Sequence, residues 1–274
     1  MIDEKPDMTP TQEQTRRWLA AVAVRRSRRT FDGVPVPEEH LDRLDALCRS
    51  FRPYGDARAV LVRKAPEGLF KGIIGSYGKV VGASSALVFL GTPAEDGTGQ
   101  HVGYTGEALV LEATALGLDT CWIGGSLDRD LAAEVAHLMP GERVFAISPL
   151  AYATADAPSS ERLIYGWGKP KKRRALEEIA PGSGSWPKWA VAGVEVAQIA
   201  PSAMNRQPWR FRMEDGSVVV SCAGTNTPIV GLSLDCGIAM LHFDLAARAV
   251  GGPGAWVGVE DDTRDVGKWV HEGQ

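Results

Sequence analysis

Apolar residues along the chain follow two spacings in turn, one typical of helices and one of strands. Thr9 to Gln12 fits a capping box with proline at the first helical position, so a helix is predicted through Trp18 and Val22. A second helix is predicted from Val36 through Leu47, where leucines recur at helical spacing. Continuous apolar runs predict short buried strands at residues 59–62, 86–90 and 144–147.

A largely apolar segment at residues 107–116 predicts a further helix, which Gly117 ends. Residues 165–186 are rich in Lys, Arg, Gly, Pro and Ser, and they separate these elements from a second series. That series comprises a helix through Ala192 and Val196, two strands and a long helix from about Cys236 to Val250. The two strands are predicted at residues 209–213 and 217–220, around the turn at 214–216. Helices and strands therefore mix in both parts of an α+β protein.

An internal repeat supports a division into two related halves. Gly103 to Gly125 aligns with Gly237 to Val259 without a gap, and both segments are predicted as a helix, a glycine and a strand containing tryptophan. Any two apolar helices that end in glycine share part of this spacing, which is the alternative to a duplication. The division places the first half at residues 1–164, a crossover linker at 165–186 and a second, truncated half at 187–274.

Composition narrows the class of protein. Apolar residues make up 44% of the 274 positions, enough for a packed core, and the formal net charge of -4 gives no global attraction to nucleic acid or membranes. No stretch approaches the roughly 20 apolar residues that span a bilayer. Because Met1 to Gln14 is acidic and polar, we expect a cytoplasmic protein.

Cysteine usage predicts neither a disulfide framework nor a zinc site. No two cysteines form a Cys-x-x-Cys pair, and no histidine lies at metal-ligand spacing from them, so no metal site is assigned. We expect free and mostly buried thiols at Cys48, Cys121, Cys222 and Cys236.

Two segments concentrate groups suited to binding a ligand with a phosphate. Three guanidinium groups and a hydroxyl, those of Arg25, Arg26, Arg29 and Ser27, lie within a short stretch, and guanidinium can bond two phosphate oxygens at once. The alternative is a solvated surface charge run. Pro201 to Phe211 has prolines that fix φ, and it offers Ser202 and Asn205 as short donors and acceptors. The alternative is a capped turn before a strand.

Both segments match patterns of one family. Arg25 to Phe31 matches Arg-x-Ser-x-(Arg/Lys)-x-Phe, and Pro201 to Phe211 matches Pro-Ser-x-x-Asn-x-Gln-Pro-Trp-x-Phe. With these motifs the chain resembles the nitroreductase family, in which the first motif of one subunit and the second motif of its partner complete an FMN site. In that family both motifs lie close together near the start of a subunit, whereas here most of the chain separates them. The resemblance implies a nitroreductase-like α+β fold whose two tandem related halves, the second shortened, pack as an intramolecular pseudo-dimer.

The resemblance also implies which residues contact FMN. Arg25, Arg26 and Ser27 would hold the phosphate and ribityl chain, and Arg29 would lie near the pyrimidine end of the ring. The other implied contacts come from both halves, and they are Lys79, Trp122, Ile123, Gly124, Gly125, Lys171, Arg173, Pro201, Ser202 and Asn205.

Three of these assignments keep an alternative. The segment from Gly117 to Ser126 matches the one that passes beside the flavin ring, where a backbone N–H bonds N5 and glycine permits close approach; it also fits a helix cap followed by a buried strand. Lys79 matches a cation near N1 and O2 that stabilises the reduced ring, or it is solvated. The basic run 171–174 matches residues that complete the phosphate site, or it is a nucleic-acid or solvent patch.

Each half lacks one of the two motifs. The first half reads Arg49 to Gly55 where a Pro-Ser-x-x-Asn segment is expected, and the second half has no Arg-Arg-Ser-x-Arg element ahead of Ala192. A symmetric dimer has two equivalent composite sites, so a pseudo-dimer that retains each motif once keeps one site and loses the other. We therefore expect one FMN per chain, and a monomer that acts as a pseudo-dimer.

The resemblance implies an FMN-dependent oxidoreductase with ping-pong hydride transfer from NAD(P)H, through FMN N5, to a small acceptor such as a nitroaromatic or quinone. No catalytic side chain is assigned, because no Ser-His-Asp or Cys-His set stands out and flavin can carry the redox step. The alternative is a flavin-binding or sequestering protein, or a pseudoenzyme without turnover. Nucleic-acid binding is disfavoured because net charge is acidic and no aromatic residues interleave the basic clusters.

Overall fold

A computed structural model of the protein describes residues 9–71, 80–93, 97–154, 172–226, 231–259 and 264–272. The first half contains α1 (Gln12–Val24), α2 (Glu38–Ser50), β1 (Ala57–Val62), β2 (Ser85–Gly91), α3 (Thr98–Ala115), α4 (Arg129–Val135) and β3 (Arg143–Leu150). The remainder contains α6 (Leu176–Ile179), η1 (Ser183–Ser185), α7 (Lys188–Ala197), η2 (Ala203–Asn205), β4 (Trp209–Glu214), β5 (Ser217–Cys222), α8 (Leu232–Ala249), β6 (Gly254–Val257) and β7 (Asp265–His271).

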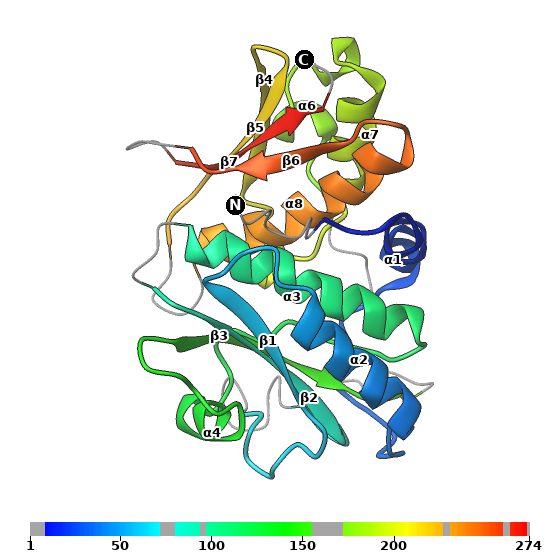
Figure 1. Cartoon of the computed structure of the whole chain (residues 1–274), viewed down its shortest axis with the longest axis vertical. Coiled ribbons are helices and arrows are strands. Elements are labelled where there is room, and N and C mark those ends of the chain that lie inside the picture. Colours follow the sequence, from blue (N-terminus) through cyan, green and yellow to red (C-terminus); the bar gives the residue numbers. More distant parts are fainter. Residues whose placement is uncertain are drawn as a thin grey trace, which may run out of the picture.

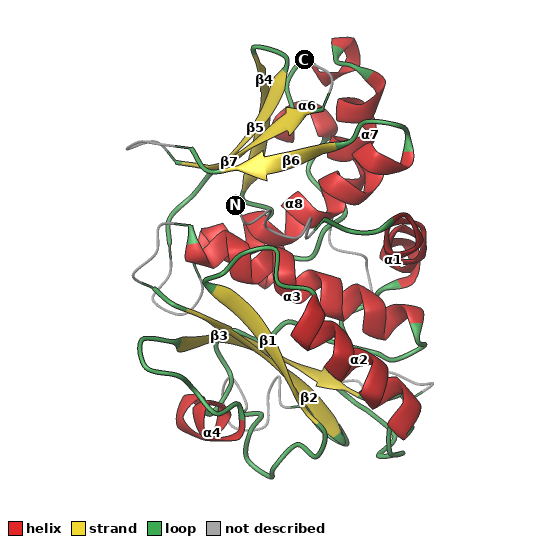
Figure 2. Cartoon of the chain, in the orientation of Figure 1, coloured by secondary structure: helices red, strands yellow, loops and turns green. Residues whose placement is uncertain are grey.

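Two antiparallel sheets enclose a central layer formed by α3 and α8 (Figure 1). One sheet has the order β1-β2-β3, and α2 covers its inner face beside α3. The other has the order β4-β5-β7-β6 and packs on α8 together with α7 (Figure 2). The two central helices have the most extensive contact of any pair of elements in the described chain. The mixed helix and sheet architecture confirms the predicted α+β class.

The two sheets share a pattern of neighbours. In the second sheet β6 pairs with β7, and β7 pairs with β5. In the first sheet β3 pairs with β2, and its other edge meets the segment after α3 through the bridge between Ile123 and Ile147. In the repeat alignment, residues 120–123 correspond to the residues of β6. The same order of paired segments therefore occurs on both sides of the central helices.

Two glycines allow the central helices to touch. A Cβ on Gly103 would lie 2.1 Å from the carbonyl oxygen of Leu234, and a Cβ on Gly237 would lie 2.0 Å from that of Gln100. No side chain fits at either distance, so the backbones meet only because both residues are glycine. The alignment that pairs Gly103 with Gly237 also pairs Gln100 with Leu234, so each helix contributes equivalent positions to the crossing.

Most predicted elements are present, with shifts that have local causes. The predicted cap of the first helix is wrong by two positions: Thr11 is the N-cap, its hydroxyl accepts from the N–H of Gln14, and the Gln14 side chain accepts from the Thr11 N–H. α3 begins at Thr98 rather than at residue 107, because its first turns carry small and polar residues against α8. The helix-ending glycines predicted in both repeats have positive φ, 83° at Gly117 and 81° at Gly251.

Several features lie outside the sequence predictions. α4 and β7 have no counterpart among the predicted elements. The described part of the predicted linker, 172–186, contains α6 and η1, and residues 165–171 lie outside the described residues. Within the described ranges, no helix combines the length and the hydropathy that crossing a membrane requires.

Candidate functional site

The arginine motif lies directly after α1 and runs beside the segment that follows α3. Ser27 forms a parallel bridge with Thr120, and the Arg28 N–H donates to the Thr120 carbonyl at 2.9 Å. Two further bridges fix the motif, from Thr30 to Val81 and from Phe31 to Ala153. These backbone contacts bring the first motif and the predicted flavin-ring segment together, although Ser27 and Thr120 lie far apart in the sequence.

Arg129, the first residue of α4, holds the glycines of the flavin-ring segment. Its guanidinium donates to the carbonyl of Gly124 at 2.7 Å and to that of Val144 at 2.6 Å. Because the carbonyl and N–H of one peptide point in opposite directions, the Gly124–Gly125 peptide turns its N–H away from Arg129. Burial, followed by repulsion from Arg143, lowers the pKa of Arg129, which nevertheless remains a cation at neutral pH.

The second motif forms a strained loop between α7 and β4. Three of its residues that are not glycine have positive φ, 54° at Met204, 56° at Asn205 and 49° at Gln207. Such conformations cost on the order of 1 kcal/mol or more each, and they persist where surrounding bonds fix them. The Ser202 hydroxyl accepts from the Gln207 N–H at 3.0 Å, and a buried carboxylate of α8, Asp235, accepts from the Ala203 N–H at 3.0 Å. Strain in a loop held this way indicates a functional segment.

Arg173 joins the two motifs. Its guanidinium donates to the carbonyls of Ala200 at 2.7 Å and Ile199 at 2.9 Å, and to Oδ1 of Asn205 at 3.3 Å. Burial and, second, the positive charge of Arg25 lower the pKa of Arg173. Arg25 of the first motif therefore lies within electrostatic range of Arg173, which contacts the second motif.

This arrangement fits an anionic ligand such as the phosphate of FMN. Within the described part of the chain, no carboxylate forms an ion pair with Arg25, Arg26 or Arg173, so protein charge does not balance them. Among the described residues, the Arg25 guanidinium donates only to the Ser27 hydroxyl, at 3.3 Å. The Thr120 hydroxyl is buried beside Ser27 and has no hydrogen-bond partner among the described residues. A buried hydroxyl without a partner is costly unless a ligand satisfies it, and cations without a carboxylate partner attract an anion.

The predicted contact residues differ in how they are placed. The structure brings Arg25, Ser27, Arg173 and Asn205 to one region through the contacts above, and Pro201 lies buried at the base of the loop. The Arg26 side chain is exposed and donates to the backbone carbonyls of Ala23 and Arg25. Arg29 contributes its carbonyl to the Val81 N–H. Lys79 and Lys171 lie outside the described residues.

The side chain of Trp122 packs in the core, and its backbone belongs to the segment predicted to pass beside the flavin ring. Its indole N–H donates to the buried carboxylate of Glu107 at 2.6 Å, and His242 of α8 meets the same carboxylate at 2.9 Å. The Trp122 ring packs on Phe89 with centroids 4.4 Å apart. Ile123 is likewise buried and pairs with β3. The site segment is thereby anchored to both central helices.

Sequence reasoning did not identify Thr120, Arg129 or Asp235. The hydroxyl of Thr120 belongs to a predicted segment, but nothing in the sequence shows that it faces Ser27. Arg129 belongs to a helix that was not predicted. The signal for Asp235 is an acidic residue in a largely apolar helix, because such a group requires a buried partner, and Asp244 in the same helix shares that signal.

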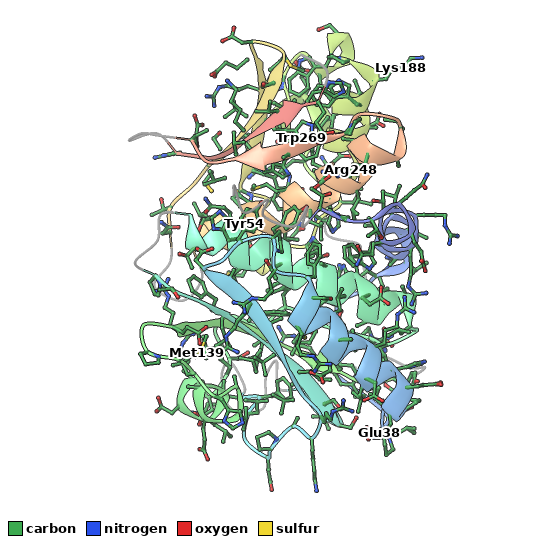
Figure 3. The ribbon with its side chains drawn as sticks, viewed as in Figure 1. Glu38, Tyr54, Met139, Lys188, Arg248 and Trp269 are labelled. Atoms are coloured by element: carbon green, nitrogen blue, oxygen red, sulfur yellow. The ribbon has the colours of Figure 1, made fainter. Side chains whose placement is uncertain are left out.

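The first half has a loop at the place that corresponds to the second motif, and it is filled with aromatic rings. Tyr54 stacks on His101 of α3 with centroids 3.9 Å apart, and the His101 ring bonds the Asp56 carboxylate at 2.8 Å. Figure 3 shows Tyr54 beside the first turns of α3. The repeat alignment pairs His101 with Asp235, the residue that holds the second motif. One loop therefore presents polar groups, whereas its counterpart is packed against its own half.

Asp235 gives the site a measurable pH dependence. Burial raises its pKa from 3.8 to about 6, against the opposing effects of the Ala203 N–H and Arg206. A pKa raised in the folded state favours folding at low pH, and this contribution is lost as pH rises through about 6. We expect the unfolding free energy of the wild type, minus that of Asp235→Asn, to fall on the order of 2 kcal/mol from pH 4 to pH 7. Urea unfolding across this range measures it, and a pH-independent difference contradicts the assignment.

Comparisons with known proteins bear on the family and the fold. A family model described as "Putative TM nitroreductase" matches residues 18–247. The crystal structure of a "putative nitroreductase" from Thermotoga maritima is 21% identical, with a TM-score of 0.60 over 92% of this chain and 91% of that one. At this level of sequence identity, the match shows a similar fold and nothing more.

Two further solved structures match a smaller share of the chain. An "oxidoreductase containing FMN" is 24% identical, with a TM-score of 0.45 over 59% of this chain and 88% of that one. An "FMN-dependent Nitroreductase" from Clostridium difficile is 19% identical, with a TM-score of 0.41 over 56% of this chain and 98% of that one. No curated protein sequence matches the chain.

Proposed function

Because the chain belongs to the nitroreductase family whose model spans most of its length, we propose that it is an FMN-dependent oxidoreductase with a single flavin site built from both halves. The observation that carries the proposal is the convergence of Arg25 and Arg173 beside the strained second motif, without a carboxylate partner among the described residues. The proposed electron donor is NADH or NADPH, and the proposed acceptor is a small oxidant such as a nitroaromatic or a quinone.

The proposed architecture is an intramolecular pseudo-dimer. Three observations support it: the shared order of paired segments in the two sheets, the equivalent glycines at the crossing of α3 and α8, and the equivalent placement of His101 and Asp235 against corresponding loops. In a two-fold interface, position i of one copy meets position j of the other and the reverse contact also occurs. The contacts of Gly103 with Leu234 and of Gly237 with Gln100 follow that rule.

The same correspondence explains why we propose one FMN per chain. At the retained site, Ser202 and Asn205 belong to a polar loop that faces an arginine motif. At the corresponding place in the first half, Phe51 is 5% exposed and Tyr54 is stacked on His101. Burial raises the pKa of Tyr54, so this phenol stays neutral in an apolar setting. That loop lacks the Pro-Ser-x-x-Asn pattern of the second motif, and its aromatic rings pack against their own half.

The chain's own residues bind and orient the cofactor in this proposal, and bound FMN supplies the hydride chemistry at N5. Arg25, Ser27 and Arg173 hold the phosphate end, and Asn205 is fixed in place by its bond to Arg173. The backbone at Gly124 and Gly125 would contact the bound ring, and Arg129 sets the direction of the peptide between them. Met204 lies on the same loop as Asn205, and its apolar side chain is 83% exposed, so a planar acceptor can pack against it.

Steady-state kinetics test the activity. Purified protein loaded with FMN is expected to oxidise NADH or NADPH when nitrofurazone or a quinone is present, and double-reciprocal plots at several acceptor concentrations are expected to be parallel. Parallel lines indicate that donor and acceptor react in separate half-reactions. A yellow protein whose absorbance bleaches with neither donor contradicts the oxidoreductase proposal and supports a flavin-binding protein without turnover.

Arg129 is expected to act as a positioning residue. Replacing Arg129 by alanine frees the Gly124 carbonyl, so the adjacent N–H loses its fixed direction towards the ring. We expect the midpoint potential of bound FMN to shift by tens of millivolts, because one hydrogen bond to a reduced flavin is worth about 1 kcal/mol. Affinity for FMN should change less than threefold, since the phosphate contacts remain. Arg143→Ala, a neighbouring arginine stacked on Phe145, is the matched control and should leave the potential unchanged.

A further inference from the structure

Two cysteines meet where β5 of the second sheet ends beside α8. Cys222 is the last residue of β5, and Cys236 lies in the first turns of α8. Their sulfur atoms are 2.9 Å apart, closer than two sulfur atoms approach without a bond or a hydrogen bond between them. Cys236 is wholly buried, whereas Cys222 is partly exposed. The Cys222 thiol is therefore accessible to a small reagent, whereas the Cys236 thiol is reached only through Cys222.

The pair lies directly behind the second motif. Trp209, which closes that motif, faces Cys222 in the register of β4 and β5. Asp235, the neighbour of Cys236, accepts from the Ala203 N–H and pairs with Arg206. Any bond between the two sulfur atoms therefore ties the strand next to the motif to the helix turn that holds the motif.

The other two cysteines differ in both position and environment. Cys48 on α2 and Cys121 after α3 are buried in the first half, and neither has another thiol beside it among the described residues. Burial, with the charge of Asp45 second, raises the pKa of Cys48 to about 12, which keeps that thiol protonated and unreactive. The chain thus carries its own internal controls for thiol reactivity.

We propose that Cys222 and Cys236 are a thiol–disulfide modification site that a peroxide oxidises and a small dithiol reduces. In the first step the Cys222 sulfur attacks the peroxide, the O–O bond breaks, and a sulfenic acid and one water form. In the second step the Cys236 sulfur attacks the sulfenic sulfur, an S–S bond forms and a second water leaves. Two thiols lose two electrons and two protons in all, and one hydrogen peroxide is reduced to two waters.

The disulfide closes a short loop that includes the N-terminus of α8. Cross-linking removes conformational freedom from the unfolded chain, so the oxidised form is expected to melt several degrees higher than the reduced form. Because Asp235 lies inside this loop, oxidation also restrains the turn that holds residues 203–206. This inference does not depend on flavin binding, and it is tested on apoprotein and on FMN-loaded protein alike.

Peptide mapping tests the proposal on the native chain. Reduced protein is treated with a small excess of hydrogen peroxide, and the reaction is quenched. The protein is alkylated with N-ethylmaleimide, first in the folded state and then after unfolding, and it is digested without reductant. We expect two of the four thiols to be lost, one intrachain linkage between the peptides that contain Cys222 and Cys236, and full recovery of both with dithiothreitol. Four alkylatable thiols after oxidation, an interchain linkage, or Cys222 recovered only as sulfinic acid overturns the proposal.

Two variants separate the pair from general oxidation. Cys236→Ser leaves Cys222 without its resolving thiol, so the intrachain linkage and the rise in melting temperature should both disappear. Cys48→Ser is the matched control, and it should form the same linkage as the wild type. A rise in melting temperature on oxidation that persists in Cys236→Ser contradicts the assignment, because the disulfide is absent in that variant.

Discussion

Replacing Arg25 by alanine is expected to weaken FMN binding by roughly 10- to 100-fold and to leave folding unchanged. The Arg25 side chain bonds only the Ser27 hydroxyl among the described residues, so its removal leaves no protein group unsatisfied. A charge-assisted hydrogen bond to phosphate contributes about 1.5–3 kcal/mol, which gives this range of affinity. Titration of apoprotein, followed by the quenching of FMN fluorescence, measures the dissociation constant.

Riboflavin makes the test specific for the phosphate. It lacks the phosphate but keeps the ring and ribityl chain, so wild type and Arg25→Ala should bind it with equal affinity. Arg49→Ala is the matched control, since Arg49 is exposed on α2 and pairs with Asp45; it should bind FMN as the wild type does. An equal loss of riboflavin and FMN affinity in Arg25→Ala contradicts a phosphate role for this residue.

Replacing Gly237 by alanine is expected to lower the free energy of unfolding by about 3 kcal/mol or more. The new Cβ would lie 2.0 Å from the Gln100 carbonyl oxygen, so α3 and α8 must separate to admit it. Gly103→Ala should have a similar effect, because its Cβ would meet the Leu234 carbonyl in the equivalent way. Urea unfolding, with the soluble yield of each variant, measures the effect.

The expected sign is opposite to that of an unconstrained helix. Alanine in place of glycine inside a helix normally stabilises it by about 1 kcal/mol, so destabilisation can come only from the crossing. Gly184→Ala is the control, because a Cβ at that position meets nothing within 4 Å, and it should change stability by less than about 0.5 kcal/mol. Unchanged or increased stability of Gly237→Ala contradicts the close packing of the central helices.

The sequence predicted the elements that depend on local pattern. Buried strands such as β2 and the apolar helix α8 were placed within a few residues, because every side chain of β2 is buried and nearly every turn of α8 is apolar. α4 and β7 were missed for the opposite reason. α4 is short and half exposed, and β7 mixes charged and aromatic residues.

The candidate site could be predicted where a motif carried it, but not where tertiary contacts carry it. The two motifs were recognised because their residues are contiguous; in the structure Arg173 bonds Asn205 of the second motif, and the charge of Arg25 in the first motif reaches Arg173. Arg129 acts through a carbonyl, and any side chain that reaches Gly124 could do so. The predicted cap of α1 was two residues too early, because Thr9 and Thr11 both fit the capping-box pattern. Only the hydrogen bonds between Thr11 and Gln14 show which of them caps the helix.

The number of flavins per chain tests the central claim most directly. A composite site that retains each motif once predicts one FMN for each chain, and the aromatic packing of Tyr54 on His101 closes the corresponding place in the first half. Native mass spectrometry of FMN-saturated protein, with flavin quantified after denaturation, gives the ratio and the oligomeric state together. We expect a monomer that carries one FMN. Two FMN per chain, or a flavin bound only by a dimer of chains, contradicts a single site shared between the two halves.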